Sequence, residues 1–286
     1  MSTAAQSAPS GGQRLSPQNY RFFQDYIYRE SGIVLEESKD YLIESRLGPI
    51  ARRRNLSDLN EICTLLQSGS RNGLHREVVE AMTTNETLFF RDPPLWADLK
   101  ATILPELIRA RSNSRCLRFW SAAVSSGQEA YSLAMLLSEM GLAGWNLSIY
   151  ATDISQQMVD RARAGEYTQM EINRGMPAAL AVKYFSRKGL SWCVNDELKR
   201  MIRFERFDLR QPLQTAGTFD IVMCRNVLIY FDVETKCRIL RSLRGAIARG
   251  GCLVLGSAET TLNLDPSLQR KTTTRASFYE VRREGK

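Results

Sequence analysis

The sequence predicts an α/β protein in two parts, a small N-terminal helical domain and a larger domain built on a parallel β-sheet. Two observations carry this prediction. Apolar residues recur with a helical period through the first third of the chain. From Arg115 onward, short apolar runs typical of buried strands alternate with amphipathic helical segments. A length of 286 residues leaves room for both parts.

The N-terminal part, expected at residues 14–84, predicts a small bundle of short helices. Its apolar stripes are Phe22, Phe23, Tyr26 and Ile27; Ile43, Leu47, Ile50 and Ala51; Leu59, Ile62, Cys63 and Leu66; and Val78, Val79 and Met82. In the second stripe, Gly48 and Pro49 should kink or split the helix, because proline removes a helical hydrogen bond. Residues 1–13 have no apolar centre, so we expect a disordered tail rather than a signal peptide.

The second part, expected at residues 111–286, predicts a parallel sheet with right-handed crossovers. The predicted strands are residues 116–121, 147–152, 202–207, 219–224 and 252–256. Helical stripes are formed by Ala130, Leu133, Ala134 and Leu137, by Met158, Val159 and Ala162, and by Ile239, Leu243 and Ile247. Residues 268–273 and 276–281 are expected to pair as antiparallel edge strands. The long connection from Gly165 to Met201 predicts a small insertion, at about 168–201.

Composition narrows the class of protein. With 43% hydrophobic and 24% charged residues, the chain is typical of globular proteins. The most apolar stretch, Phe219 to Phe231, contains Asp220, Arg225 and Asn226, so no membrane span is predicted and the expected location is the cytoplasm. Six cysteines without a CxxC pair and a single histidine predict no metal site. The net charge of +8 is diffuse and does not by itself indicate nucleic acid.

The turn after the first predicted strand is the place where a ligand is most expected, because open parallel sheets bind ligands beyond the carboxyl ends of their strands. This turn is rich in small residues around Gly127, which let a ligand approach the backbone. The GxGxxG pattern is absent, which disfavours NAD and FAD. A phosphate-free cofactor such as S-adenosylmethionine remains possible, and carboxylates would be needed to bind its cationic groups.

Four polar residues follow the predicted strands at this edge. Asp153 could accept hydrogen bonds from ribose hydroxyls or cap the next helix, which Ser155 could also do. Glu129 could meet the ammonium group of a cofactor or simply favour the helix dipole. Asp208 and Asn226 could hydrogen-bond an adenine or its neighbours.

Two other features allow simple interpretations. Arg46, Arg52, Arg53 and Arg54 form either a solvated helix face or a docking surface for an acidic helical partner. The segment DPPL at residues 92–95 is similar to the Asp-Pro-Pro-aromatic loop of amino methyltransferases. Its fourth residue is not aromatic and it precedes the first strand, so it does not predict that activity.

Four ordered motifs resemble those of one family. They are TTNETLFFRD (83–92), WSAAVSSGQEAYSLAM (120–135), YATDIS (150–155) and FDIVMCRNVLIYF (219–231). Together they are similar to the CheR-type chemotaxis-receptor glutamate O-methyltransferases. The resemblance implies a Rossmann-like domain that uses S-adenosylmethionine to esterify glutamates on the cytoplasmic helical bundle of methyl-accepting chemotaxis proteins. It also implies that residues 85–110 link the domains and contribute to the cofactor site, and that the insertion is a small β-subdomain.

The resemblance also implies roles for individual residues. Those expected to line the cofactor pocket are Asn85, Thr87, Arg91, Glu129, Asp153, Asp208, Leu209, Arg225 and Asn226. Arg91 and Tyr230 would face the reacting carboxylate. The residues expected to bind the acidic receptor helices are Arg46, Arg52, Arg53, Arg54 and Arg187.

Departures from the family pattern affect the expected partners. The insertion is shorter than in members that bind a receptor C-terminal pentapeptide and lacks their Gly-rich turn and histidine, so we expect no pentapeptide binding. Val124, Gln128 and Ala130 depart from the common residues but suit the same turn. Two alternatives stay open: a methyltransferase acting on RNA or a small molecule, and a non-catalytic regulator that binds S-adenosylmethionine. We expect neither a nucleic-acid partner nor membrane insertion.

Overall fold

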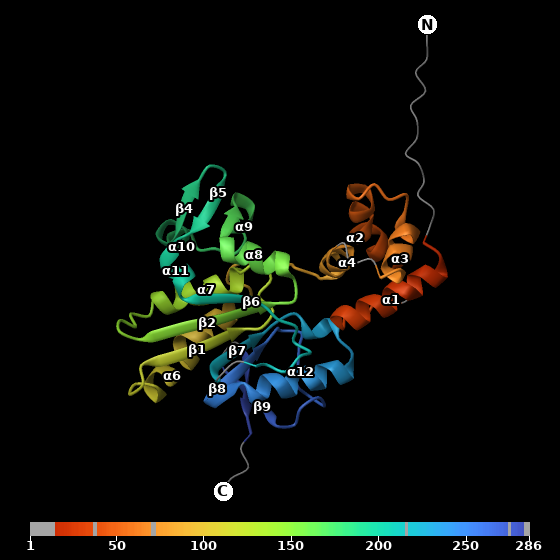
Figure 1. The fold of residues 1–286 in the computed structure, drawn as a ribbon. Helices are drawn as coiled ribbons and strands as arrows, with labels where there is room; N and C mark the ends of the chain where they lie inside the picture. Colours follow the sequence, from red (N-terminus) through yellow and green to blue (C-terminus); the bar gives the residue numbers. More distant parts are fainter. Residues whose placement is uncertain (1–14, 37–38, 70–72, 215–216, 274–275, 283–286) are drawn as a thin grey trace. The chain divides into compact units, whose positions relative to one another are not determined.

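The computed structural model describes residues 15–36, 39–69, 73–214, 217–273 and 276–282 (Figure 1). The chain divides into two compact units, residues 1–84 and residues 85–286. The tail expected at residues 1–13 lies outside the described residues. Where the structure describes the chain, no helix combines the length and the apolar character that crossing a bilayer requires.

The described residues of the first unit form four helices, α1 (Pro17–Ser31), α2 (Asp40–Arg53), α3 (Leu59–Gln67) and α4 (Leu74–Met82). The expectation that Gly48 and Pro49 split a helix is wrong in one respect, because α2 runs through Pro49 as a single element. Leu47 before the proline and Ile50 after it are both buried. Packing of this face offsets the hydrogen bond that the proline removes.

The second unit is built on a seven-stranded sheet in the order β6-β2-β1-β7-β8-β10-β9. Its strands are β1 (Cys116–Ser121), β2 (Asn146–Asp153), β6 (Ile202–Arg206), β7 (Phe219–Cys224), β8 (Ile247–Leu255), β9 (Leu268–Thr272) and β10 (Ser277–Val281). The first five are parallel, and β10 and β9 form the predicted antiparallel pair. The strand order reverses between β1 and β7, and such a switch point is where open sheets bind ligands.

Helices cover both faces of this sheet (Figure 1). Phe119 and Ile149 face a cluster that includes α7 (Gln128–Ser138) and α8 (Gln156–Ala164). Trp120 and Tyr150 face the opposite cluster, which includes α12 (Val233–Gly245). This alternation follows from the two-residue period of a strand. Ile247, which we expected on the helix before the last parallel strand, instead begins β8 and pairs with Phe219.

Residues 85–110, expected to be a linker, contain three short helical elements. They are α5 (Pro93–Asp98), the π-helix η1 (Leu99–Ile103) and α6 (Leu104–Ala110). Leu99 and Leu104 are fully buried in the cluster beneath α7, so this segment is part of the core of the second unit.

The long connection after α8 holds a second, three-stranded antiparallel sheet, as predicted for an inserted subdomain. Its strand order is β3-β5-β4. Its elements are β3 (Glu166–Thr168), α9 (Gln169–Asn173), α10 (Ala178–Tyr184), β4 (Phe185–Lys188), β5 (Ser191–Val194) and α11 (Asp196–Arg200). Tyr167 and Phe185 anchor the insertion by packing on Phe89, with ring centroids 5.0 Å and 5.7 Å away.

Gly127, the residue before α7, provides a test of the turn after β1. Its φ is +98°, and a Cβ here would lie 2.9 Å from Cβ of Ala162 and 3.0 Å from Oη of Tyr167. Gly127→Ala should therefore lower the free energy of unfolding in urea by about 2–4 kcal/mol. Gly141→Ala is the matched control: φ is +65° and nothing lies within 4 Å, so a loss of about 1 kcal/mol is expected. Equal losses would show that packing against α8 is not the constraint.

Candidate active site

Several of the predicted cofactor residues meet at the carboxyl edge of the parallel strands. Glu129 is the second residue of α7, the helix that follows β1, and Asp153 is the last residue of β2. Arg225 and Asn226 directly follow β7. Because β2, β1 and β7 are neighbours in the sheet, residues separated by nearly 100 positions share one edge.

Arg225 is the centre of the hydrogen-bond network at this edge. Its side chain is 2% exposed, and its Nη1 donates to Oε2 of Glu129 at 2.9 Å. Its Nη2 donates to the carbonyl oxygen of Arg91 at 3.1 Å and to the carboxylate of Asp92. Ser121 donates its hydroxyl to the other oxygen of Glu129 at 2.8 Å. Glu129 therefore serves as a largely buried partner of Arg225, with 12% of its side chain exposed, a role that neither sequence interpretation included.

Arg91 is held chiefly through its backbone. Its carbonyl oxygen accepts hydrogen bonds from Arg225 and, at 2.8 Å, from Nε1 of Trp96. Its guanidinium contacts the carbonyl oxygen of Glu86 through Nη1 at 3.3 Å. The Arg91 residue is partly exposed, so its backbone is held in place while its guanidinium remains accessible to solvent.

Asp153 fixes the small-residue turn after β1. One of its oxygens accepts from the backbone N–H of Ser125 at 2.8 Å, and the other accepts from the N–H of Ser155 at 2.9 Å. The capping of α8 belongs to Ser155, whose hydroxyl accepts from the N–H of Met158. The hydroxyl of Ser125 donates to the carbonyl oxygen of Asn85 at 2.8 Å, which ties residue 85 to the same turn.

Backbone strain gathers at this edge. Seven non-glycine residues of the described ranges have positive φ, and four of them are Phe90 (49°), Asp92 (62°), Ser125 (50°) and Asn226 (57°). Such conformations cost about 1–3 kcal/mol each and persist only where the surroundings enforce them. Their concentration beside Arg225 and Asp153 is typical of a functional site.

The other predicted cofactor residues lie in different surroundings. Asp208 accepts two hydrogen bonds from Nε of Arg210, at 3.0 and 3.1 Å, and one from its Nη2 at 2.6 Å. If Asp208 contacts an adenine, its carboxylate must accept hydrogen bonds from the adenine and from Arg210 at the same time. Leu209 is buried in the cluster on the α12 side of the sheet. Thr87 is partly buried in the segment before α5.

Cys224, the last residue of β7, and Tyr230, six residues later, differ in exposure and in chemical role. Cys224 is fully buried, and burial with the nearby charges of Glu259 and Glu129 raises the pKa of its thiol well above the usual value. The thiol stays protonated and does not serve as a nucleophile. Tyr230 ends the short 3-10 helix η2 (Leu228–Tyr230) and is partly exposed.

The predicted receptor-binding arginines divide into two groups. Arg46 donates to the carbonyl oxygen of Met82 at 2.6 Å, and Arg54 pairs with Glu77 at 2.7 Å. The hydrogen bond to Glu77 raises the pKa of Arg54, and both arginines join α2 to α4 or the residues that follow it. Arg187 instead lies exposed on β4, with its guanidinium carbon 5.6 Å from the ring centroid of Trp192.

Arg52 and Arg53, at the C-terminal end of α2, are the exposed members of the Arg52–Arg54 segment. Arg53 contacts Glu77 at 3.4 Å, with 62% of its side chain exposed. Contacts between exposed charges contribute little to stability, so Arg53 can exchange this partner for another carboxylate.

Two functional candidates were missed from the sequence. Asp92 was set aside with its DPPL segment, yet its carboxylate is paired with Arg225. Glu259, in the loop after β8, accepts hydrogen bonds from the backbone that follows β7. The only available signal for Glu259 was an acidic residue close behind a predicted strand.

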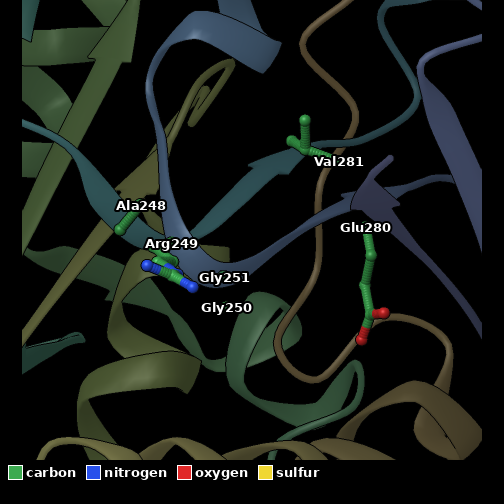
Figure 2. Close-up of a pocket in the computed structure, with 6 residues that line it drawn as sticks. All are labelled: Ala248, Arg249, Gly250, Gly251, Glu280 and Val281. Atoms are coloured by element: carbon green, nitrogen blue, oxygen red, sulfur yellow. The ribbon is translucent and has the colours of Figure 1, made fainter. Parts of the chain in front are cut away.

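A separate pocket lies away from this edge. It is lined by Ala248, Arg249, Gly250, Gly251, Glu280 and Val281 (Figure 2). These residues come from the first half of β8 and the end of the antiparallel β10, whereas the candidate site lies beyond the last residues of the parallel strands. None of the predicted site residues lines this pocket.

The chain matches two family models and several curated proteins. Residues 85–277 match the family model described as CheR methyltransferase, SAM binding domain, and residues 18–83 match CheR methyltransferase, all-alpha domain. The chain is 40% identical over 257 residues to chemotaxis protein methyltransferase 1 of Pseudomonas aeruginosa, covering 88% of this chain and 93% of that one. It is 37% identical over 270 residues to chemotaxis protein methyltransferase Cher2 of Pseudomonas putida, covering 92% and 98%.

The Arg225 network gives a stability prediction. Arg225→Met should lower the free energy of unfolding by about 3–5 kcal/mol, because it leaves Glu129 buried without a cation. Adding Glu129→Gln should recover part of this loss, with a coupling of about 1–3 kcal/mol in a double-mutant cycle measured by urea unfolding. The exposed pair Arg203–Glu205, with N and O 2.8 Å apart, is the control and should couple by less than about 1 kcal/mol. Additive losses at Arg225 and Glu129 would contradict the network.

Proposed function

Because this chain belongs to the CheR methyltransferase family, we propose that it methylates glutamate side chains of chemotaxis receptors. Its cofactor is S-adenosylmethionine, in keeping with the SAM binding domain that covers residues 85–277. The relatives named chemotaxis protein methyltransferases support a receptor substrate. The observation that carries the proposal is the meeting of Glu129, Asp153 and the Arg225 network with Arg91 at one strand edge.

The residues at this edge fit S-adenosylmethionine. Two carboxylates, Glu129 and Asp153, suit an ammonium group and ribose hydroxyls, and the small-residue turn at Gly127 suits a ligand without phosphates. Nε of Arg225 is buried and has no hydrogen-bond partner among the described residues. The residues proposed to hold the cofactor are Asn85, Thr87, Arg91, Glu129, Asp153, Asp208, Leu209, Arg225 and Asn226.

Methylation of a carboxylate requires positioning rather than a general base. A glutamate side chain, with an ordinary pKa of about 4.3, is already an anionic nucleophile at neutral pH. When bound, S-adenosylmethionine supplies an electrophilic methyl group on a sulfonium. The methyl group would pass to one carboxylate oxygen of the substrate, and the electron pair of the carbon–sulfur bond would leave with the demethylated cofactor. The products are a glutamyl methyl ester and S-adenosylhomocysteine.

In this reaction Arg91 and Tyr230 are the proposed catalytic residues. Arg91 would bind the oxygen of the substrate carboxylate that does not attack, because pairing with the attacking oxygen would weaken the nucleophile. Tyr230 would donate its hydroxyl to the same carboxylate. Orientation of this kind lowers barriers by up to about 7–11 kcal/mol in favourable intramolecular cases.

The receptor surface is proposed to involve the exposed arginines. Arg52, Arg53 and Arg187 have accessible guanidinium groups that suit an acidic helical partner. Arg46 and Arg54 contribute chiefly by holding α2 to its neighbours. The lack of receptor pentapeptide binding stays a prediction.

Transfer of a labelled methyl group from S-adenosylmethionine tests the function. Purified cytoplasmic fragments of chemotaxis receptors should acquire label that mild alkali releases as methanol, as expected for a methyl ester. Fragments with the modified glutamates replaced by alanine should remain unlabelled. Label on RNA, with none on receptor fragments, would contradict the proposed substrate.

Arg91→Ala tests the orientation of the substrate. Loss of the guanidinium should lower kcat for receptor fragments by about tenfold or more, while the Kd for S-adenosylmethionine rises by less than about fivefold. Arg174→Ala removes another exposed guanidinium, paired with Glu86, and should leave kcat unchanged. Unchanged turnover in Arg91→Ala would remove Arg91 from the catalytic residues.

Asp153→Ala tests the cofactor site separately. Calorimetry should show weaker binding of S-adenosylmethionine by about tenfold or more, because ribose hydroxyls and the turn at Ser125 lose a shared acceptor. Asp160→Ala in α8 is the control, because that carboxylate is exposed and pairs only locally with Arg163. Wild-type affinity in Asp153→Ala would leave this residue with a structural role alone.

A further inference from the structure

We infer that Glu259 is a positioning residue, whose carboxylate fixes the backbone after β7 and so places Asn226 and Tyr230. This inference rests on the proposed function and adds to it a residue that acts through the backbone it holds. The family resemblance assigns it no role in the site.

The carboxylate of Glu259 gathers four backbone N–H groups. Oε2 accepts from Asn226 at 2.8 Å and from Gly256 at 2.7 Å. Oε1 accepts from Val227 at 2.9 Å and from Leu228 at 2.7 Å. Since β7 and β8 are adjacent and parallel, the loop after β8 can reach the segment after β7. One side chain therefore joins the ends of two strands.

The four donors demand an acceptor-only group. Glu259 is 9% exposed, and no lysine or arginine of the described residues lies within ion-pair distance of it, so the N–H groups themselves stabilise its charge. A glutamine would place an NH₂ group against two of these donors. Buried N–H groups left without an acceptor are costly, so the segment would have to move.

The fixed segment is strained and tightly packed. Asn226 has φ of +57°, a left-handed conformation that is uncommon outside glycine and that asparagine tolerates better than most residues. Beside it, a Cβ on Gly256 would lie 2.7 Å from Nδ2 of Asn226 and 2.8 Å from Oε2 of Glu259. Only glycine permits this approach, and the approach brings the N–H of residue 256 onto the same carboxylate.

The constraint extends to Tyr230 through the short helix η2. The N–H of Tyr230 donates to the carbonyl oxygen of Val227 at 3.2 Å, and Val227 is itself held by Glu259. Leu228, the first residue of η2, is buried and bonded to the same carboxylate. The backbone position of Tyr230 is thus set by residues that Glu259 holds.

Glu259→Gln tests the inference, with Asp265→Asn as a matched control. Asp265 is another buried carboxylate after β8, which accepts from the N–H of Ser267 at 2.9 Å and pairs with Arg244 at 3.2 Å. Per site that binds S-adenosylhomocysteine, E259Q should lower kcat for receptor fragments by about tenfold or more. D265N should keep kcat within about twofold, even if its Tm falls. Amides of residues 226–228 should exchange at least about tenfold faster in E259Q alone.

The outcomes separate the inference from the proposed function. Wild-type kcat and unchanged amide exchange in E259Q would overturn the inference. A wild-type protein that does not methylate receptor fragments would overturn the proposed function, and amide exchange would still decide whether Glu259 holds the loop. If E259Q does not fold, E259D is compared in the same way: its acceptor-only group should keep 226–228 protected more than in E259A, and equal exchange in both would overturn the inference.

Discussion

The candidate active site depends first on the burial of Arg225. An arginine side chain that is 98% removed from solvent is tolerable only with anionic partners, and Asp92 and Glu129 supply them from two separate segments that both precede it in the sequence. The same side chain also takes the carbonyl oxygen of Arg91. One buried charge thereby joins the ends of β1 and β7 to the segment before α5. The proposed catalytic arginine is thus attached to the sheet by another arginine.

The same principle recurs at three of the four positions with positive φ at this edge. Arg225 holds the chain at Asp92, Asp153 holds Ser125, and Glu259 holds Asn226, in each case by hydrogen bonds to residues with positive φ. Charge-assisted hydrogen bonds are about twice as strong as neutral ones, so they are suited to hold backbone that would otherwise relax. The polar residues at this edge therefore shape the site as well as line it.

How much of this could be read from the sequence depends on the range of each interaction. Strands β1 and β7 lie where the apolar runs placed them, because burial of both faces is a local pattern. The prediction at Pro49 was wrong because tertiary contacts, which the local sequence does not show, keep α2 continuous through the proline. Asp92 and Glu259 were missed because their partners lie 133 residues away at Arg225 and 33 away at Asn226. No spacing rule connects such pairs before the fold is known.

The proposed chemistry explains why the site holds its residues in fixed positions. A carboxylate that is already ionised needs no proton removed, so a strand edge without a histidine is sufficient for its methylation. What the reaction does require is one oxygen in line with the methyl group, and a small displacement of either partner lowers the rate steeply. Rigid support of Arg91 through Arg225, and of Tyr230 through the loop that Glu259 holds, answers that requirement. In such a site, residues that never touch the substrate can control the rate as strongly as those that do.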